Sequence, residues 1–256
     1  MIKKLFLTLL LSLFLTTSVF GIGFDSDTKL LIHFDGSDGS TDDYTAETGQ
    51  TVSLVGTAQL DTAVKKFGTA SLLLDGNSDY ATVPDSADWS FGTGNFTIDA
   101  WVRYSTDPTG AHFAGWYDQY VDANNVFNIW IYDNQVRFIV KSGGSTIAYC
   151  RTDTGDIIVH NTMHHVAVVR YGTSENNLLI FVDGVSQTLS WYTAMAANAT
   201  MPDIASTLRI GYTQWQGKYF PGNIDEVRVS KGIARWTANF TPPVSEYTWR
   251  RIISIQ

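Results

Sequence analysis

The hydrophobic pattern of this chain has the short period of β-strands. Runs of β-branched and aromatic residues recur along it, separated by clusters of glycine, asparagine, aspartate and serine, and helical periodicity is nearly absent. The clearest runs are residues 30–34, 71–74, 80–83, 96–104, 126–131, 136–140, 165–170, 178–182, 207–210 and 224–229. The pattern predicts an all-β protein, an antiparallel β-sandwich of two sheets without a linker or an internal repeat.

Strand 96–104 alternates most clearly. Its even-numbered residues are apolar or aromatic and are expected to face the core, whereas Thr97, Asp99, Trp101 and Arg103 share the opposite face. An acid and a base beside a tryptophan predict that this second face is solvated or faces a ligand.

Two turns are predicted from residue type. Asp133-Asn134 and Asp183-Gly184 each stand between two apolar runs. Aspartate, asparagine and glycine tolerate the positive φ angles of tight hairpin turns, so each pair is expected to join two antiparallel strands.

The last long strand contains two adjacent carboxylates, Asp225 and Glu226. Neighbouring residues of a strand point to opposite faces, so one of the two must face inward unless a bulge intervenes. A buried carboxylate needs hydrogen-bond donors or a cation as its partner. Because we expect the two groups to face apart, they do not form a catalytic pair across one bond.

The first residues predict export. Lys3 and Lys4 precede an apolar run over residues 5–15 and then small residues, which is the pattern of a secretory signal peptide cleaved after Gly21. The run is shorter than the roughly 20 residues that a membrane span needs. We therefore predict a signal peptide over residues 1–21, a secreted or cell-surface location, and no membrane insertion after cleavage.

Net charge and cysteine content limit which partners and which stabilising bonds the chain can have. Cleavage removes the two leading lysines and leaves 15 basic against 25 acidic residues, a net charge of −10. An acidic chain without a basic stripe is not expected to bind nucleic acid. Cys150 is the single cysteine, so no intramolecular disulfide is possible and the core itself must supply the stability.

Six segments, taken in order, resemble one family. They are residues 30–36, 66–76, 94–102, 164–170, 181–184 and 222–236. Together they are similar to the laminin-G-like, concanavalin A-like lectin/glucanase jelly-roll domains. The resemblance covers about residues 28–243; it implies a jelly-roll domain over residues 22–243 and leaves a C-terminal tail over 244–256. Function follows less directly, since this fold carries lectins, carbohydrate-binding modules, glycosidases and adhesion domains.

The resemblance also implies a structural calcium ion where the first strand ends beside the last. Carried over to this sequence, its ligands are Asp35 and Asp225. Calcium takes six to eight oxygen ligands, and the loop at residues 36–43 is rich in oxygens. One family aspartate is replaced by Ala46. The alternative is that Asp225 accepts hydrogen bonds from backbone amides or pairs with an arginine.

Aromatic residues outside the strand pattern are candidates for a ligand surface. Sugar rings stack their C–H faces on indole and phenol rings, and exposed aromatic clusters often mark interaction sites. The candidates fall in three segments expected to be loops, and they are Trp116, Tyr117, Trp191, Tyr192, Tyr212 and Trp215.

Signals for catalysis are poor. Glucanases of this fold generally carry a Glu-x-Asp-x-x-Glu strand, and this chain has four glutamates, none at that spacing. Hydrolysis of a glycosidic bond needs two carboxylates facing each other across it. We therefore predict no enzyme activity.

The preferred function is a secreted, non-catalytic, lectin-like carbohydrate-binding module whose partner is a glycan or polysaccharide. The first alternative is a surface, adhesion or assembly protein that binds another protein or itself, in which the apolar tail from Tyr247 to Gln256 adds a strand to a neighbour. The lesser alternative is a polysaccharide hydrolase or lyase.

Overall fold

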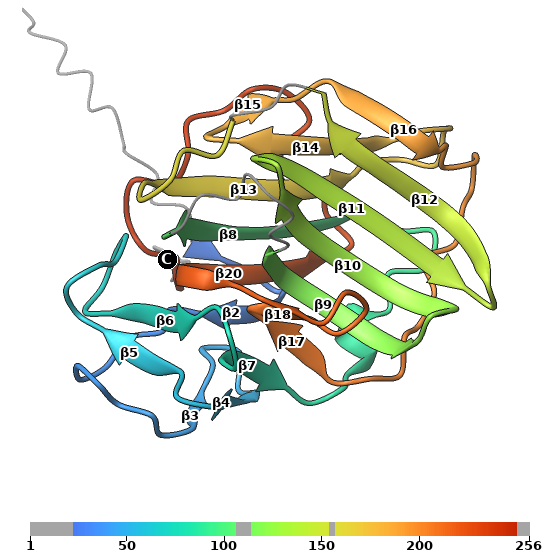
Figure 1. Ribbon diagram of the computed structural model, residues 1–256. Coiled ribbons are helices and arrows are strands. Elements are labelled where there is room, and N and C mark those ends of the chain that lie inside the picture. Colours follow the sequence, from blue (N-terminus) through green and yellow to red (C-terminus); the bar gives the residue numbers. More distant parts are fainter. Residues whose placement is uncertain (1–22, 106–113, 154–156, 250–256) are drawn as a thin grey trace, which may run out of the picture.

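The computed structural model describes residues 23–105, 114–153 and 157–249, which form two antiparallel β-sheets packed face to face (Figure 1). The nine-stranded sheet has the order β16 (Leu189–Thr193), β12 (Ser145–Thr152), β11 (Gln135–Ser142), β10 (Asn125–Tyr132), β9 (Ala114–Asp122), β17 (Leu208–Ile210), β7 (Tyr80–Val83), β4 (Thr51–Val55) and β3 (Tyr44–Thr45). The predicted all-β, two-sheet antiparallel fold is confirmed.

The eight-stranded sheet has the order β15 (Val185–Ser186), β14 (Leu178–Val182), β13 (Met163–Arg170), β8 (Phe96–Tyr104), β20 (Pro221–Lys231), β6 (Ser71–Asp75) and β5 (Gln59–Asp61), and β2 (Thr28–Ile32) also pairs with β20. Short pairs are formed by β1 (Gly23–Phe24) with β21 (Thr248–Trp249), and by β18 (Tyr212–Thr213) with β19 (Lys218–Tyr219). A single 3-10 turn, η1 (Ala87–Trp89), is the helical element of the described residues. The predicted signal peptide, residues 1–21, lies outside them.

An apolar core fills the space between the sheets. Phe96 of β8 contacts Phe127 of β10 at 5.9 Å between ring centroids, and Phe127 contacts Phe138 of β11 at 5.3 Å. All three rings are buried, and the even-numbered residues of β8 lie in this core as predicted. In Figure 1, β9–β12 run obliquely across β8, β13 and β20. The faces that meet are called inner here, and the opposite faces outer.

Both predicted hairpins form. Asp133 and Asn134 join β10 to β11 with φ angles of 49° and 56°, and Asp183 and Gly184 join β14 to β15 with φ angles of 50° and 76°. Positive φ at both central residues is the geometry of the type I′ turn. The two dipeptides therefore fix the register of two strand pairs.

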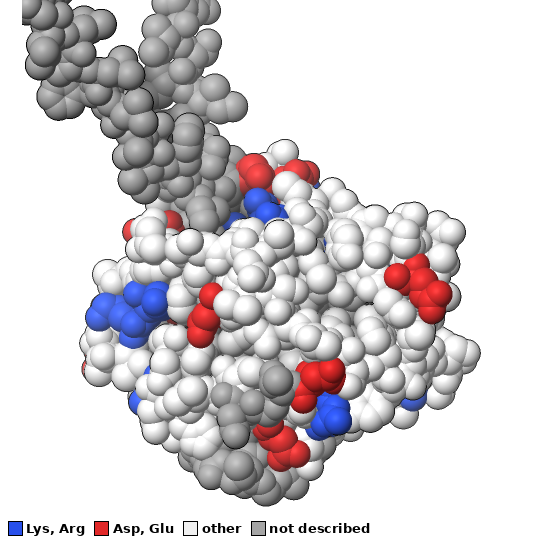
Figure 2. Space-filling view, turned by 90° about the horizontal axis from the view of Figure 1, so that it is seen from above, with Lys and Arg blue, Asp and Glu red and all other residues white. Residues whose placement is uncertain are grey.

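Charged side chains are sparse on the surface. The side seen in Figure 2 shows small, separate groups of acidic and basic residues on a mostly uncharged surface. This agrees with a chain in which charged residues are 16% of the sequence.

The outer face of β8 is covered rather than solvated. Asp99 is fully buried and Trp101 is 4% exposed, so the predicted solvated or ligand-facing surface is wrong. The segment that follows β20, residues 232–249, returns across this sheet: Trp236 and Phe240 pack against the outer side of β13 and β14, and Tyr247 packs on Leu31. The alternation of β8 could not reveal a cover supplied from more than 130 residues away.

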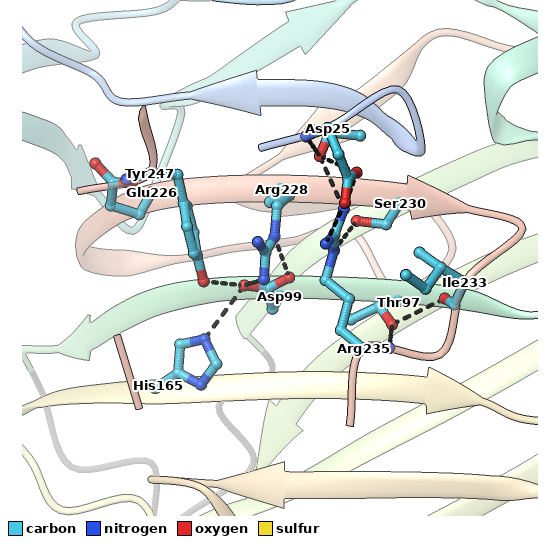
Figure 3. Close-up of polar contacts among 11 residues, drawn as sticks. Asp25, Thr97, Asp99, His165, Glu226, Arg228, Ser230, Ile233, Arg235 and Tyr247 are labelled. Atoms are coloured by element: carbon cyan, nitrogen blue, oxygen red, sulfur yellow. Dashed lines mark hydrogen bonds and ion pairs between the residues drawn. The ribbon is translucent and has the colours of Figure 1, made fainter. Parts of the chain in front are cut away.

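A buried polar network lies beneath this segment (Figure 3). The Asp99 carboxylate accepts hydrogen bonds from Arg228 at 2.9 and 3.1 Å and from the Tyr247 hydroxyl at 2.6 Å. His165 Nε2 lies 3.2 Å from the same carboxylate. All four side chains are at most 1% exposed, and the Arg228 guanidinium lies 3.8 Å from the Tyr247 ring centroid. The network joins three adjacent strands, β13, β8 and β20, to the C-terminal segment.

Asp225 and Glu226 occupy a β-bulge. Asp225 pairs with Trp101 and Arg228 with Asp99, so β20 uses one more residue than β8 over this stretch, and Glu226 has a φ of 52°. Asp225 faces the backbone of residues 66–67, and Glu226 faces Tyr247, so both lie on the outer side and both are at most 1% exposed. The prediction that they face apart is wrong because the bulge breaks the alternation.

Candidate functional site

Aromatic rings gather on the outer side of the nine-stranded sheet. This surface, called the aromatic face here, comes from β9, β10, β12, β16 and the turn between β18 and β19. Its rings are Tyr120, Trp130, Tyr132, Tyr149, Tyr192 and Trp215. Side chains of alternate residues on adjacent strands share one face, which is why residues distant in sequence meet here.

The rings form a connected series. Tyr192 stacks on Tyr149 at 4.4 Å between centroids, Tyr149 lies 6.0 Å from Trp130, and Trp130 forms a T-shaped pair with Trp215 at 6.2 Å. Trp130 is the buried base of the series, whereas 53% of Tyr192 is exposed. An exposed phenol held flat by a second ring is a preorganised stacking surface for an apolar ligand face.

Three cations border these rings. The Arg137 guanidinium lies 4.4 Å from the Tyr132 centroid, and that of Arg151 lies 5.6 Å from Tyr192. The Lys141 ammonium lies 5.8 Å from Trp215. The aromatic face can therefore offer stacking and charged hydrogen-bond donors to one ligand.

A buried polar group anchors the turn that carries Trp215. Asn128 donates from Nδ2 to Asp118 and, at 2.7 Å, to the Thr213 hydroxyl, while the Gln214 amide donates to Asp118 at 3.2 Å. Burial raises the pKa of Asp118 to about 6. Arg209 lies 3.9 Å from this carboxylate. These contacts fix the position of Trp215 above the sheet.

The six aromatic residues predicted from the sequence lie in different environments. Trp116 and Tyr117 are fully buried in the core on β9, so their assignment to a ligand-facing loop is wrong; the segment is a strand at whose bulge both rings turn inward. Trp191 is half-buried and packs against the same core. Tyr192 and Trp215 belong to the aromatic face.

Tyr212 belongs to a neighbouring group of rings. It stacks on Tyr219 at 4.4 Å and lies 5.2 Å from Tyr80. This group includes Tyr80 of β7, which pairs with β17 in the nine-stranded sheet. Its mutual stacking gives it a packing role in the β18–β19 hairpin.

Sequence reasoning missed Trp130, Tyr149, Arg137 and Arg151. They lie within regular strands, and each was indistinguishable from an ordinary strand residue. The available signal was the alternation in 145–152, where Tyr149 and Arg151 interleave with the buried Ala148 and Cys150.

The predicted calcium ligands hold one backbone segment. Asp225 Oδ2 accepts from the amides of Lys66 at 2.6 Å and Phe67 at 3.2 Å, and Asp35 Oδ1 accepts from the amides of Thr69 and Ala70. The alternative in which Asp225 accepts from backbone amides is thus realised. Gly68 lies between the two pairs, and a Cβ there would stand within 2.6 Å of the Asp35 carboxylate.

One oxygen of each carboxylate remains available. Asp225 Oδ1 is buried without a hydrogen-bond partner, and the hydrogen bonds to Asp35 all reach Oδ1. Burial raises the pKa of Asp225 to about 7, because the amides of residues 66–67 and 226 only partly replace the lost solvent. An orphaned buried carboxylate oxygen fits a hard cation.

A second cluster combines His33, Glu226 and Glu246, whose ligand atoms lie within 4.8 Å of one another. His33 Nδ1 is 2.7 Å from Glu226 Oε1. Burial would lower the pKa of His33, but the Glu226 carboxylate outweighs burial and raises it. Among the described residues, this group of three side chains could hold a metal ion, and two of its members, His33 and Glu226, already pair with each other.

No helix in the described part of the chain is both long and apolar enough to cross a bilayer.

Comparison with known proteins agrees with this architecture. A family model described as the concanavalin A-like lectin/glucanases superfamily matches residues 75–235. A comparison with curated proteins found no significant match.

Solved structures show the same fold at low identity. Domain 4 of AbnA, a GH43 extracellular arabinanase from Geobacillus stearothermophilus solved with arabinotriose, has a TM-score of 0.57 and 16% identity over 81% of this chain and 93% of that one. The binding domain of botulinum neurotoxin DC was solved with rat synaptotagmin II (TM-score 0.58, 12% identity, 81% and 49% coverage) and with SialylT (0.56, 13%, 81% and 49%). This chain thus spans about half the length of the toxin domains.

Proposed function

This chain belongs to the concanavalin A-like lectin/glucanase superfamily, and from that membership we propose that it is a secreted, non-catalytic carbohydrate-binding protein whose aromatic face holds the glycan. One observation carries the proposal: the exposed Tyr192 ring, stacked on Tyr149 at 4.4 Å, continues into Trp130 and Trp215. Sugar rings bind such surfaces through their C–H faces, and preorganised rings bind without losing much entropy. Structural neighbours of the same fold were solved with arabinotriose, with SialylT and with rat synaptotagmin II.

A hydrolytic role has less support. Asp118 is a buried carboxylate that holds the turn carrying Trp215 through the Gln214 amide. Its partners among the described residues are Asn128, Gln214 and Arg209, with no second carboxylate among them. Glycosidases place two carboxyl groups on either side of the scissile bond. The geometry therefore favours binding over cleavage.

Substitution of the exposed rings tests the proposal. Tyr192→Ala and Trp215→Ala are each expected to weaken binding of the best ligand on a glycan array at least about 10-fold, as expected for an aromatic anchor. Tyr171→Ala, a half-buried tyrosine after β13 of the other sheet, is the matched control and is expected to bind like the wild type. Absence of binding to every glycan, or unchanged binding by both face variants, contradicts the proposal.

We propose further that a structural Ca²⁺ uses the spare oxygens of Asp35 and Asp225. Calcium is then expected to raise the unfolding temperature of the wild type and to leave that of Asp225→Asn unchanged. His33→Ala is the control, because it removes the other cluster and keeps both carboxylates. An equal response of wild type and Asp225→Asn to calcium and to chelator speaks against this site.

The pH dependence in chelator supplies a separate check. Because the pKa of Asp225 is raised from 3.8 to about 7, the folded state holds a proton that the unfolded state has lost, and the free energy of unfolding falls as pH rises between these values. Over the whole range the contribution of this group is about 4 kcal/mol, and roughly 3 kcal/mol of it falls between pH 5 and pH 8. Urea unfolding at pH 5 and pH 8 is expected to show a smaller decrease for Asp225→Asn than for the wild type.

A further inference from the structure

Two arginines on the aromatic face stand directly opposite each other. Arg137 on β11 and Arg151 on β12 are register partners, and Arg137 is also the partner of Trp130 on β10. Like charges facing each other on neighbouring strands are destabilising. The chain as a whole is acidic, with a net charge of −8, so this pair is not part of a general basic surface.

Among the described residues, neither arginine has a carboxylate partner. Both donate to the same neutral oxygen, Gln135 Oε1, at 3.3 Å from Arg137 and 2.9 Å from Arg151. The ion pairs of the described residues include neither side chain, and the carboxylate of Asp153, two residues beyond Arg151, accepts instead from Ser190.

Both guanidinium groups also keep unused donors. The Nε atoms of Arg137 and Arg151 are buried without a hydrogen-bond partner, and only 8% of Arg137 is exposed to solvent. Removing a charged donor from water without a partner is costly. A bound anion offsets the repulsion between the two positive charges, and the planar guanidinium group matches a carboxylate or a sulfate.

The aromatic rings beside the two arginines indicate which kind of ligand bears the anionic group. Tyr192 lies 5.6 Å from the Arg151 guanidinium and Tyr132 lies 4.4 Å from that of Arg137. A ligand that reaches both features needs a flat apolar face and an anionic substituent on one unit.

From this arrangement we propose that the aromatic face selects acidic saccharides, with the carboxylate or sulfate of one sugar unit held by Arg137 and Arg151 while a ring stacks on Tyr192. The inference rests on the proposed carbohydrate-binding function and names its ligand class. Lys141, which lies 5.8 Å from Trp215, adds a third positive charge at the other end of the ring series.

Calorimetry with matched ligands tests this selection. A trimer of galacturonate is compared with its methyl ester, and a sulfated galactose trisaccharide with its desulfated form, so that each pair differs in charge and keeps its rings. At least one anionic member is expected to bind 10-fold or more tightly than its neutral partner, and its affinity is expected to fall as sodium chloride rises from 50 to 500 mM. The preferred pair distinguishes carboxylate from sulfate.

Charge-neutral variants locate the effect. Arg151→Gln, at a half-buried position, and Arg137→Gln are each expected to bring the anionic ligand to the affinity of the neutral one. Lys65→Gln makes the same change of charge at an exposed site between β5 and β6 and is expected to retain the preference. Circular dichroism confirms that each variant is folded, and Arg151→Gln suffices if Arg137→Gln fails to fold.

Each outcome has one meaning. Equal binding of the anionic and neutral partners in both pairs overturns the inference and leaves the proposed function in place, provided that Tyr192→Ala weakens both. A preference for anions that survives in Arg151→Gln also overturns it. Failure of every saccharide on the array contradicts the proposed function itself.

Discussion

Replacement of Arg228 by methionine is expected to lower the free energy of unfolding by about 3–5 kcal/mol, because it leaves the Asp99 carboxylate charged and buried without its main partner. Arg228 and Asp99 are both fully buried, and their two hydrogen bonds measure 2.9 and 3.1 Å. The Tyr247 hydroxyl and His165 cannot replace a permanent positive charge. Urea unfolding monitored by tryptophan fluorescence measures the change.

The double variant Asp99→Asn/Arg228→Met is the control for this prediction. It removes both charges and is expected to recover much of the stability, since a buried pair often contributes little net free energy while a single buried charge costs a great deal. A single Arg228→Met variant as stable as the wild type contradicts the role assigned to the pair.

The dependence of the free energy of unfolding on pH below about 4 tests the same network independently. Burial alone would raise the pKa of Asp99, but the charge of Arg228 and the hydrogen bond from His165 outweigh it and hold that pKa well below its ordinary value of 3.8. A depressed carboxyl pKa stabilises the fold above its unfolded-state pKa, and this stabilisation is lost as pH falls below about 4. Arg228→Met is expected to lack this contribution.

Ending the chain at Pro243 is expected to destabilise the domain by about 3–5 kcal/mol, the range for loss of a buried aromatic side chain. Tyr247 is 1% exposed, its hydroxyl donates to Asp99 at 2.6 Å, and its amide donates to Glu226 at 3.2 Å. Tyr247→Ala is expected to reproduce most of the loss, and Tyr247→Phe about 1–2 kcal/mol of it through the missing hydroxyl. Urea midpoints of the three variants measure these differences, and a truncated chain with the wild-type midpoint contradicts them.

The structure also bears on assembly through the tail. In the alternative function the tail adds a strand to a neighbour, but Tyr247 packs on Leu31 of the same chain and β21 pairs with β1. Residues 250–256 lie outside the described residues, so their part in assembly stays a prediction. Size-exclusion of a chain ending at Trp249 therefore tests assembly without removing Tyr247.

The sequence located part of the aromatic face. Tyr192 and Trp215, two of the six aromatic candidates, stand in polar stretches of the sequence and lie on this face; their role in ligand binding stays a prediction. Trp116 and Tyr117 looked equally polar in context, yet they lie on β9 with their rings in the core. Residue type alone cannot separate these cases, since a β-bulge decides which way each ring turns.

The sequence by itself determined most of the long strands and the core-facing side of those that alternate clearly, such as β8. It did not identify β9 and β16, whose aromatic residues were expected in loops. Period-two alternation and the Asp133-Asn134 and Asp183-Gly184 turns are local features, and burial between two sheets follows directly from them. The tertiary structure alone decided the use of the outer faces. The segment 232–249 covers the face that carries Asp99, whereas the face that carries Tyr149 and Arg151 keeps rings and charges near solvent. The segment that covers an outer face is distant along the chain from the strands it covers, so no local sequence pattern reveals which face is covered.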